Sequence, residues 1–249
     1  MSTSFNKIRA PEKLHHCVTR TLALRVMDAE RASERLDFPN EAELCQQLGV
    51  SRSILREAVK VLADKGMMEV RPRSGMRSRP RAEWNVLDPD ILGWQAQLSP
   101  DPRFLRDLCE VRLAIEPTAS GFAAVRATPQ EIAAIEECLE RREAVTGSVN
   151  FEEAINLDLQ FHTAVVAASH NPLFQRLSAS IREPFRVALS YTARLRASVA
   201  LELAAHRTLL DAIRRHQPMA ARAAAEEIVG YAMLAVEQVV RSQENHGGG

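Results

Sequence analysis

The order of helix caps and helix stops near the N-terminus constrains the fold of this chain more than any other feature of its sequence. Asn40 is a good N-cap for a short helix over residues 41–48, and Gly49 ends that helix. Ser51 caps a second helix, which continues until Gly66 stops it. Two helices with so short a turn between them are typical of a helix-turn-helix.

The segments on either side extend this pair into a larger unit. Before it, apolar residues recur every four positions over residues 11–27, which predicts one more amphipathic helix. After it, residues 67–70 read as a short strand and residues 71–75 as a tight, basic turn. Three helices followed by a basic hairpin predict a winged helix-turn-helix over residues 1–80.

The rest of the chain is punctuated differently. Breaks that contain Pro or Gly and carry a Ser, Thr, Asn or Asp recur after residue 80, each followed by a run rich in alanine and leucine. No segment of note alternates apolar and polar residues there, so strands are not expected. The sequence therefore predicts a mainly α protein. A linker and linker helix over residues 81–102 join the winged domain to an all-α bundle of six to seven helices over residues 103–249.

Charge is divided unequally between these two parts, although the whole chain is formally neutral. Residues 1–81 hold 16 Lys and Arg against 10 Asp and Glu, and the remaining residues hold 16 against 22. A basic end on an acidic body suggests a module that binds a polyanion, with a solvated basic face as the simpler alternative. Four scattered cysteines, no signal peptide and no long apolar run indicate a cytoplasmic protein with reduced thiols and no membrane partner.

The start of the second short helix carries residues suited to contact DNA. Arg52 and Arg56 are four residues apart and share one helical face, opposite the apolar residues. Arginine can clamp guanine or straddle phosphate oxygens, and the hydroxyls of Ser51 and Ser53 can donate to phosphate from the same turn. Two arginines alone would indicate only a solvated face. The preceding helix and the basic wing make a DNA-reading helix the better interpretation.

Four motifs in this region resemble the DNA-binding domain of GntR-type bacterial transcription regulators. They are Pro39-Asn40-Glu41-Ala42-Glu43-Leu44, Leu48-Gly49-Val50-Ser51-Arg52, Arg56-Glu57-Ala58 and Leu62-Ala63-Asp64-Lys65-Gly66. The resemblance implies that Arg52 and Arg56 read the operator, that Glu41 supports them, and that the tip of the wing enters the minor groove. The family's wing has two glycines around one residue. Here Arg73 replaces the first while Gly75 remains, so Arg73 is expected to add a contact to the minor groove or to phosphate.

Ionisable residues within apolar stretches mark the candidate site of the second domain. Asp158 and His162 are four residues apart on one expected helix, where a carboxylate and an imidazole can reach one metal ion. His206 lies in the middle of a later helix. Arg112 is surrounded by apolar residues, with Glu116 one turn on, so it needs a carboxylate partner from the protein or from a ligand. Taken singly, each histidine is better explained as a hydrogen-bonded core or surface residue.

Taken together, these residues resemble the FCD ligand-binding domain of the FadR subfamily. The motifs are Glu110-x-Arg112-x3-Glu116-Pro117, Asp158-x3-His162, Asn171-Pro172-Leu173 and His206-Arg207-x2-Leu209-x-Asp211-Ala212-Ile213. The resemblance implies that Asp158, His162 and His206 hold a divalent metal, zinc (Zn²⁺) or nickel (Ni²⁺). It also implies that Arg112 helps to bind the carboxylate of a small organic acid. Ile228 stands where the family has its third histidine, so we expect three protein ligands and a weaker metal site.

The stretch from Trp84 to Trp94 narrows the choice of ligand. It resembles the linker helix of sugar-acid regulators in this subfamily, those of galactonate catabolism among them, and these relatives also lack the third histidine. We therefore expect a homodimeric repressor that a hexonate or a similar hydroxy acid releases from a palindromic operator. The two tryptophans are equally explained as anchors that dock the linker helix onto the ligand domain.

Three classes of protein stay open on the sequence alone. The first is this ligand-responsive regulator, with a sugar acid or another organic acid as effector. The second is a metal-dependent hydrolase, although no base or nucleophile stands beside the expected metal ligands. The third is a DNA-binding dimer whose helical domain ignores ligands. We favour the first, and expect no enzyme, because only a regulator uses both domains. If Arg112 is structural, Arg186 and Arg207 are the next candidate anchors for a carboxylate.

Overall fold

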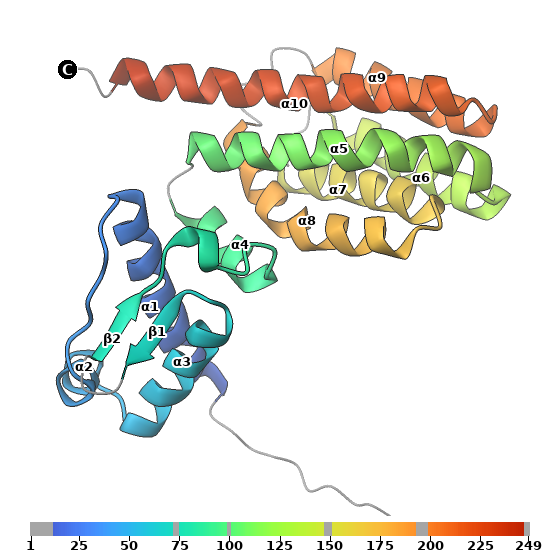
Figure 1. Cartoon of the computed structure of the whole chain (residues 1–249). Coiled ribbons are helices and arrows are strands. Elements are labelled where there is room, and N and C mark those ends of the chain that lie inside the picture. Colours follow the sequence, from blue (N-terminus) through green and yellow to red (C-terminus); the bar gives the residue numbers. More distant parts are fainter. Residues whose placement is uncertain (1–11, 72–74, 99–100, 147–150, 193–198, 247–249) are drawn as a thin grey trace, which may run out of the picture. The chain divides into compact units, whose positions relative to one another are not determined.

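The computed structural model divides into two compact units, residues 1–95 and residues 96–249 (Figure 1). The residues that it describes are 12–71, 75–98, 101–146, 151–192 and 199–246. Arg73 lies outside the described residues, so its contact with DNA stays a prediction. Gly75 is described and has a φ of +82°, in the left-handed region that favours glycine. No helix in the described part of the chain is long and apolar enough to cross a membrane.

Three helices and a two-stranded wing make up most of the first unit. The elements are α1 (Glu12–Arg31), α2 (Glu41–Leu48), α3 (Arg52–Asp64), β1 (Met68–Arg71), β2 (Gly75–Ser78) and the 3-10 turn η1 (Arg81–Glu83). β1 and β2 pair antiparallel. α1 packs against α3, and the apolar faces of the two helices are buried at Leu22, Val26, Leu55 and Leu62. This arrangement confirms the winged helix-turn-helix.

Local sequence sets the ends of α2 and α3. Asn40 Oδ1 accepts a hydrogen bond from the amide of Glu43 at 3.0 Å, and Ser51 Oγ accepts one from the amide of Ile54 at 3.4 Å. Gly49 ends α2 with a φ of +64°, which glycine adopts without steric strain. Asn40 therefore sets the start of α2, and Gly49 and Ser51 form the turn between the helices, as the sequence predicts.

The helix that follows the wing, α4 (Pro89–Gln97), is tied to the end of α3 through Lys65. The ammonium of Lys65 lies 2.6 Å from Asp88 Oδ1 and 2.8 Å from Asp90 Oδ2. Asp88 also caps α4, because the same oxygen accepts from the amide of Asp90 at 2.9 Å. The carbonyl of Lys65 accepts from the amide of Asn85 at 2.9 Å. One residue thus holds the start of α4 through both its side chain and its backbone.

Close packing supports this junction. Gly66 has a φ of +78°, and a Cβ atom on it would lie 2.2 Å from the carbonyl oxygen of Glu83, so only glycine fits. Trp84 is buried, and its indole N–H donates to the carbonyl of Arg79 at 2.9 Å. The ring of Trp94 lies beside the ammonium that holds α4, 5.8 Å from nitrogen to ring centroid. These contacts of both tryptophans lie within the first unit, whereas the sequence allowed them to dock the linker helix onto the helical domain.

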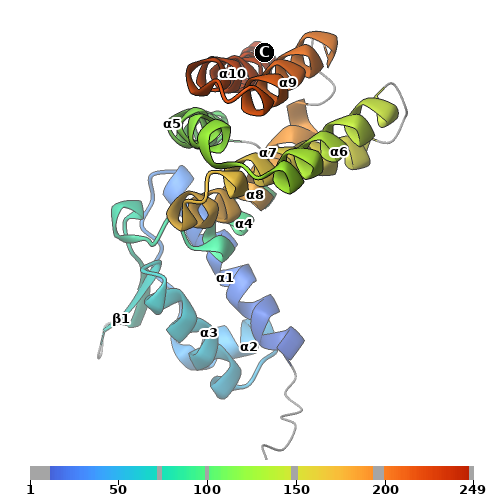
Figure 2. The same ribbon diagram turned by 90° about the vertical axis from the view of Figure 1, so that its right-hand side faces the viewer.

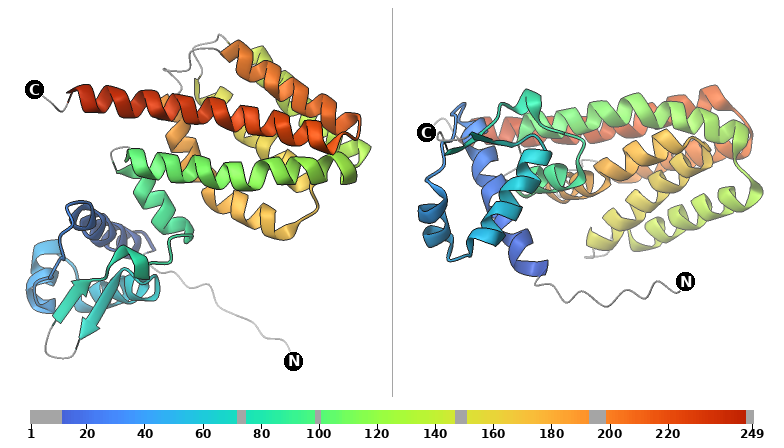
Figure 3. Two further views of the ribbon diagram at one scale, coloured as in Figure 1. Left: turned by 45° about the horizontal axis from the view of Figure 1, so that its top comes forward. Right: turned by 60° about the horizontal axis from the view of Figure 1, so that its bottom comes forward.

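Six helices form the described part of the second unit. They are α5 (Pro102–Arg126), α6 (Pro129–Val145), α7 (Phe151–Ala168), α8 (Pro172–Thr192), α9 (Val199–Arg214) and α10 (Pro218–His246). α10 lies beside α5 (Figures 1 and 3). Figure 2 shows α5 between a layer of α9 and α10 and a layer of α6, α7 and α8. This bundle confirms the all-α fold expected for the second part of the chain.

An apolar core holds the bundle together, and the side chains of Leu139, Phe161, Leu209 and Ile213 are almost fully buried in it. Ile228 belongs to the same core, so the position of the family's third histidine offers no ligand atom. Among the described residues of this unit, seven acidic, basic and histidine side chains are nevertheless buried, which is rare for such groups unless they are paired. They are Arg112, Glu116, Arg142, Asp158, His162, Glu202 and His206.

Candidate functional site

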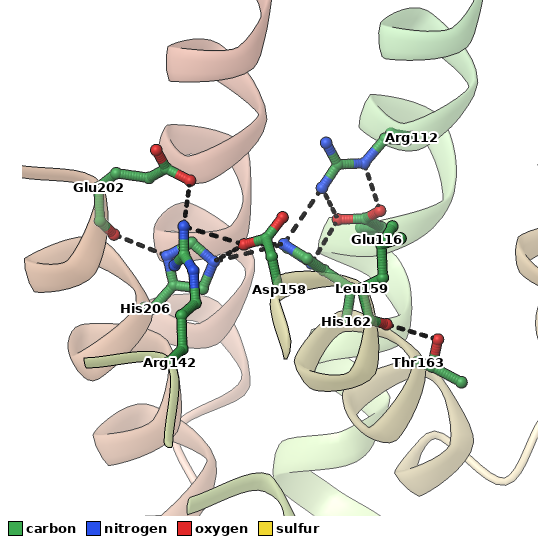
Figure 4. A network of polar contacts seen from close by, with 9 residues as sticks. All are labelled: Arg112, Glu116, Arg142, Asp158, Leu159, His162, Thr163, Glu202 and His206. Carbon is green, nitrogen blue, oxygen red and sulfur yellow. Dashed lines mark hydrogen bonds and ion pairs between the residues drawn. The ribbon is translucent and has the colours of Figure 1, made fainter. Parts of the chain in front are cut away.

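Arg112 of α5 is buried and held by a carboxylate one helical turn away (Figure 4). Its Nε donates to Glu116 Oε1 at 2.6 Å and its Nη2 to Glu116 Oε2 at 3.0 Å. Phe185 of α8 covers the guanidinium, with 3.8 Å from Cζ to the ring centroid. Burial alone would raise the pKa of Glu116, but Arg112 and His162 together outweigh this effect and lower the pKa to about 2. Glu116 is therefore ionised at neutral pH, and Glu110, the other acidic residue near Arg112, is exposed.

Asp158 and His162 of α7 meet His206 of α9 in the same part of the bundle (Figure 4). His206 Nε2 lies 3.3 Å from Asp158 Oδ1 and 3.3 Å from His162 Nε2. His162 Nε2 lies 3.8 Å from Asp158 Oδ1. All three side chains are buried. The structure thus brings together the three residues that the sequence proposed as metal ligands, from two helices.

The partners of the two imidazoles leave three acceptor atoms facing one another. His206 Nδ1 lies 2.6 Å from the carbonyl oxygen of Glu202, and His162 Nδ1 lies 3.0 Å from Glu116 Oε2. A carbonyl and an ionised carboxylate only accept, so a ring that is neutral in this network carries its hydrogen on Nδ1 and a lone pair on Nε2. Burial lowers the pKa of His206, which favours its neutral ring. Two imidazole lone pairs and the carboxylate of Asp158 therefore converge.

This set of donor atoms fits a divalent cation. Asp158 Oδ1 is buried and accepts no hydrogen bond among the described residues, although Arg142 Nη2 lies 3.1 Å from it, so this oxygen could also bind a metal cation. Ligand atoms bound about 2.1 Å from a tetrahedral ion lie about 3.4 Å apart, close to the separations of 3.3 and 3.8 Å found here. The Nδ1–H groups of His162 and His206 have the hydrogen-bond partners that orient metal-bound imidazoles.

Arg142 of α6 and Glu202 of α9 are the members of this cluster that the sequence did not lead us to expect. Arg142 Nη2 lies 3.1 Å from Asp158 Oδ1 and 2.6 Å from Glu202 Oε1, so Arg142 joins α6 to α7 and α9. A signal for it was present in the sequence. Ile135, Leu139 and Arg142 follow the spacing of one helical face and are all buried, so the arginine continues the apolar face of α6.

The charges of the cluster sum to minus one when both imidazoles are neutral. Arg112 and Arg142 are positive, and Glu116, Asp158 and Glu202 are negative. A divalent cation would change the sum to plus one, and the carboxylate of a bound acid would then neutralise it. A cation and an organic acid therefore complement each other at this site, while the two guanidiniums oppose the cation.

A small hollow opens beside Arg112. It holds about 20 Å³, which is room for about one water molecule. Thr163 of α7 and Ser178 and Arg182 of α8 line it together with Arg112 and other residues of the cluster. The hollow therefore joins the buried ionic cluster to polar groups on a further helix.

The two other arginines considered as carboxylate anchors lie apart from this cluster. Arg186 pairs with Glu183 and Glu152, and its side chain is 30% exposed. Arg207 pairs with Glu143 and is 62% exposed. Arg112, with 3% of its side chain exposed, is the better placed of the three for a buried ligand.

In the first unit, the residues expected to contact DNA lie at the exposed start of α3. Ser51, Arg52, Ser53 and Arg56 are all exposed. The hydroxyl oxygens of Ser51 and Ser53 are 2.9 Å apart. Arg56 Nε donates to Glu41 Oε1 of α2 at 2.9 Å, so α2 helps to orient this guanidinium. The geometry therefore leaves a cationic surface on the helix that follows the turn.

A winged helix-turn-helix with exposed arginines, joined to a helical unit with a buried ionic site, defines a DNA-binding regulator with a second, helical domain. The chain belongs to the GntR family of bacterial regulatory proteins, and its helical unit is an FCD domain. The gntR family model matches residues 32–77 and the FCD model residues 107–230. The proteins of this family that the chain resembles are transcription regulators. The chain is therefore a regulator, and the hydrolase alternative is wrong.

Two relatives and one solved structure show how far the similarity extends. The galactonate operon transcriptional repressor of Escherichia coli (strain K12) is 34% identical over 203 residues, which cover 81% of this chain and 88% of the repressor. The Uxu operon transcriptional regulator of the same organism is 33% identical over 149 residues, 58% of this chain and 53% of that regulator. The structure of Streptococcus agalactiae GntR has 26% identity and a TM-score of 0.50, covering 89% of this chain and 99% of that chain.

Proposed function

We propose that this regulator controls the catabolism of a sugar acid and that a small carboxylate, such as a hexonate, is its effector. The observation that carries the proposal is the buried guanidinium of Arg112 beside a small hollow, since a guanidinium binds a carboxylate through paired charge-assisted hydrogen bonds. The relatives named for the galactonate and Uxu operons support the same class of ligand. We expect a repressor because the galactonate relative is one.

A metal ion would give the hydroxyl groups of such an acid a second partner. Asp158, His162 and His206 would hold a divalent cation, Zn²⁺ or Ni²⁺, which supplies a Lewis acid for carboxylate and hydroxyl oxygens. Around it, Glu116 fixes the orientation of His162, and Arg112 orients the carboxylate of the acid. The alternative is that these residues form a purely hydrogen-bonded pocket.

On the DNA side, a homodimer would place two copies of α3 in the half-sites of a palindromic operator. Arg52 and Arg56 would contact bases and phosphates, and Ser51 and Ser53 would contact phosphate. Effector binding would then release the operator through α4. A difference of about 1–3 kcal/mol between the DNA-competent and DNA-incompetent arrangements is sufficient. Such a regulator acts on the chromosome, in the cytoplasm.

A thermal-shift screen of the full chain tests the class of effector. Galactonate, other hexonates and unrelated organic acids are compared with and without Zn²⁺ or Ni²⁺. We expect selective stabilisation by a hexonate, because a ligand that binds only the native state stabilises it. The same acid should weaken the salt-dependent binding of operator DNA. Stabilisation by a different class of acid would instead favour the second candidate, a regulator of another catabolic operon.

The role of Arg112 has its own test. Arg112→Ala should leave operator binding intact and raise the effector concentration at half response tenfold or more, and Arg112→Lys should restore only part of the response. Arg106→Ala, at an exposed residue of the same helix, is the matched control. A purely structural Arg112 predicts early melting with an unchanged effector response.

Elemental analysis tests the metal. We expect a divalent ion in the wild-type chain and its loss in Asp158→Asn and His206→Ala. No stoichiometric metal after supplementation would leave the hydrogen-bonded pocket as the correct description.

A further inference from the structure

We propose that Glu116 is an internal competitor of the effector: its carboxylate fills the place on Arg112 that the carboxylate of the effector takes. The inference rests on the proposed function in one respect, that the effector is a carboxylate. Beyond the proposed function, it assigns to Glu116 a role in determining which acids act as effectors.

The Nε and Nη2 edge of Arg112, one of the two edges of a guanidinium that can take a carboxylate, is already in use. Glu116 takes both Nε, at 2.6 Å, and Nη2, at 3.0 Å, which is the paired arrangement of a bound carboxylate. The same Nη2 also lies 3.2 Å from His162 Nε2. Nη1 makes no contact with the other residues drawn in Figure 4. An incoming acid can therefore gain a paired contact on the Nε and Nη2 side only if Glu116 leaves it.

The space beside Arg112 leads to the same conclusion. The hollow holds about 20 Å³, which suits about one water molecule and not a sugar acid. Glu116 lines this hollow. Rotating its side chain away would enlarge the hollow and free the two donors in one movement. Displacing Phe185 instead would uncover the guanidinium without freeing either nitrogen.

Neighbouring groups make the exchange feasible. Phe185 covers the guanidinium at 3.8 Å and would keep it in place while its carboxylate partner changes. His162 Nδ1 lies 3.0 Å from Glu116 Oε2, so a displaced Glu116 still has a hydrogen-bond donor. The charge of the effector would replace that of Glu116 at Arg112, and no guanidinium would be left unpaired in the core.

Because of this competition, an acid binds well only if its contacts with the site are stronger than those of Glu116. The apparent affinity for an acid is reduced by the fraction of molecules in which Arg112 is free. A simple acid offers only the carboxylate that Glu116 already provides, so it gains little by exchange. A polyhydroxy acid gains further contacts from groups such as Ser178 and Arg182. Glu116 thus selects against short monocarboxylates.

Two variants of Glu116 test the proposal in the full chain, with Glu110→Gln as the matched control because Glu110 is exposed on the same helix. Glu116→Gln keeps the shape of the side chain and loses its charge, and calorimetry should show galactonate binding at least tenfold more tightly than to the wild type. Glu116→Ala leaves a gap, and propionate should fill it and raise the melting temperature. Propionate should not stabilise the wild type or Glu110→Gln.

The results separate this inference from the proposed effector. Galactonate that binds Glu116→Gln no more tightly than the wild type, or propionate that stabilises the wild type as much as Glu116→Ala, overturns the inference. If galactonate binds no form of the chain while propionate rescues Glu116→Ala alone, the inference stands and the sugar-acid effector falls. If Glu116→Ala has a low melting temperature without ligand, the test still works, because the quantity measured is the rise in melting temperature when propionate is added.

Discussion

Replacing Arg142 with alanine removes the cation that Asp158 and Glu202 share. All three side chains are at most 8% exposed, and the guanidinium lies 3.1 Å from one carboxylate and 2.6 Å from the other. Breaking a buried ion pair by removing one partner costs about 3–5 kcal/mol, because the remaining charge stays buried without compensation. Here two like charges remain. For a unit of this size we expect the melting temperature to fall by about 6–20 °C.

The assay follows from the placement of the tryptophans. Trp84 and Trp94 are the two tryptophans of the chain and lie in the first unit. Circular dichroism in urea therefore reports mainly the helical unit, while tryptophan fluorescence reports the winged unit. The measurement is made with a chelator present, so that a metal ion cannot replace the lost guanidinium. We expect the dichroism midpoint to fall and the fluorescence midpoint to stay.

Two further variants show whether the ion pairs are the cause. Arg141→Ala removes an exposed neighbour on the same helix and should change stability by less than about 0.5 kcal/mol. Adding Glu202→Gln to Arg142→Ala should recover part of the loss, because it neutralises one of the two buried carboxylates that the guanidinium joined. An Arg142→Ala variant within about 1 kcal/mol of the wild type would refute the reasoning.

Three other perturbations follow from the structure. Arg52→Ala and Arg56→Ala should each weaken operator binding by about 1–3 kcal/mol in fluorescence anisotropy, and unchanged affinity in both would exclude α3 as the reading helix. Gly66→Ala should destabilise the winged unit by more than the roughly 1–2 kcal/mol that a left-handed backbone costs a non-glycine residue, because the added Cβ also clashes with the carbonyl oxygen of Glu83. Tryptophan fluorescence in urea measures this loss of stability. The backbone amide of Thr128 lowers the pKa of Glu131. The wild type should therefore be more stable than Glu131→Gln above about pH 4.5, and this difference should disappear as the pH falls below that value. A difference in the free energy of unfolding that stays constant with pH would contradict this.

The first unit could be predicted almost completely from the sequence because its turns depend on neighbouring residues. Asn40, Gly49 and Ser51 act within three or four positions of themselves, so cap rules place α2 and α3 without tertiary information. The tie between Lys65 and Asp88 could not be predicted this way. Their separation of 23 residues becomes a contact only after the wing folds back, and no local rule encodes that.

The buried site shows the same division. The spacing of Asp158 and His162 places them on one helical face, which the sequence alone predicts. Which other helix meets that face depends on packing, and family resemblance supplied His206. Arg142 escaped notice because it stands in a charged run, Glu140-Arg141-Arg142-Glu143, that reads as a solvated surface. The spacing of Arg142 from Ile135 and Leu139 is the sign of burial in the sequence, and the packing of α6 shows that Arg142 is buried while Arg141 is exposed.

The junction at Lys65 also decides where this protein can be cut to make hybrids. The end of the wing near residue 80 looks like the natural place to join its DNA-binding part to a foreign sensor. A cut there would separate Lys65 from Asp88 and Asp90 and would remove Trp84 from its contact with Arg79. A chimera that keeps residues 1–95 retains all of these contacts. The exchangeable module is therefore the winged domain together with most of α4.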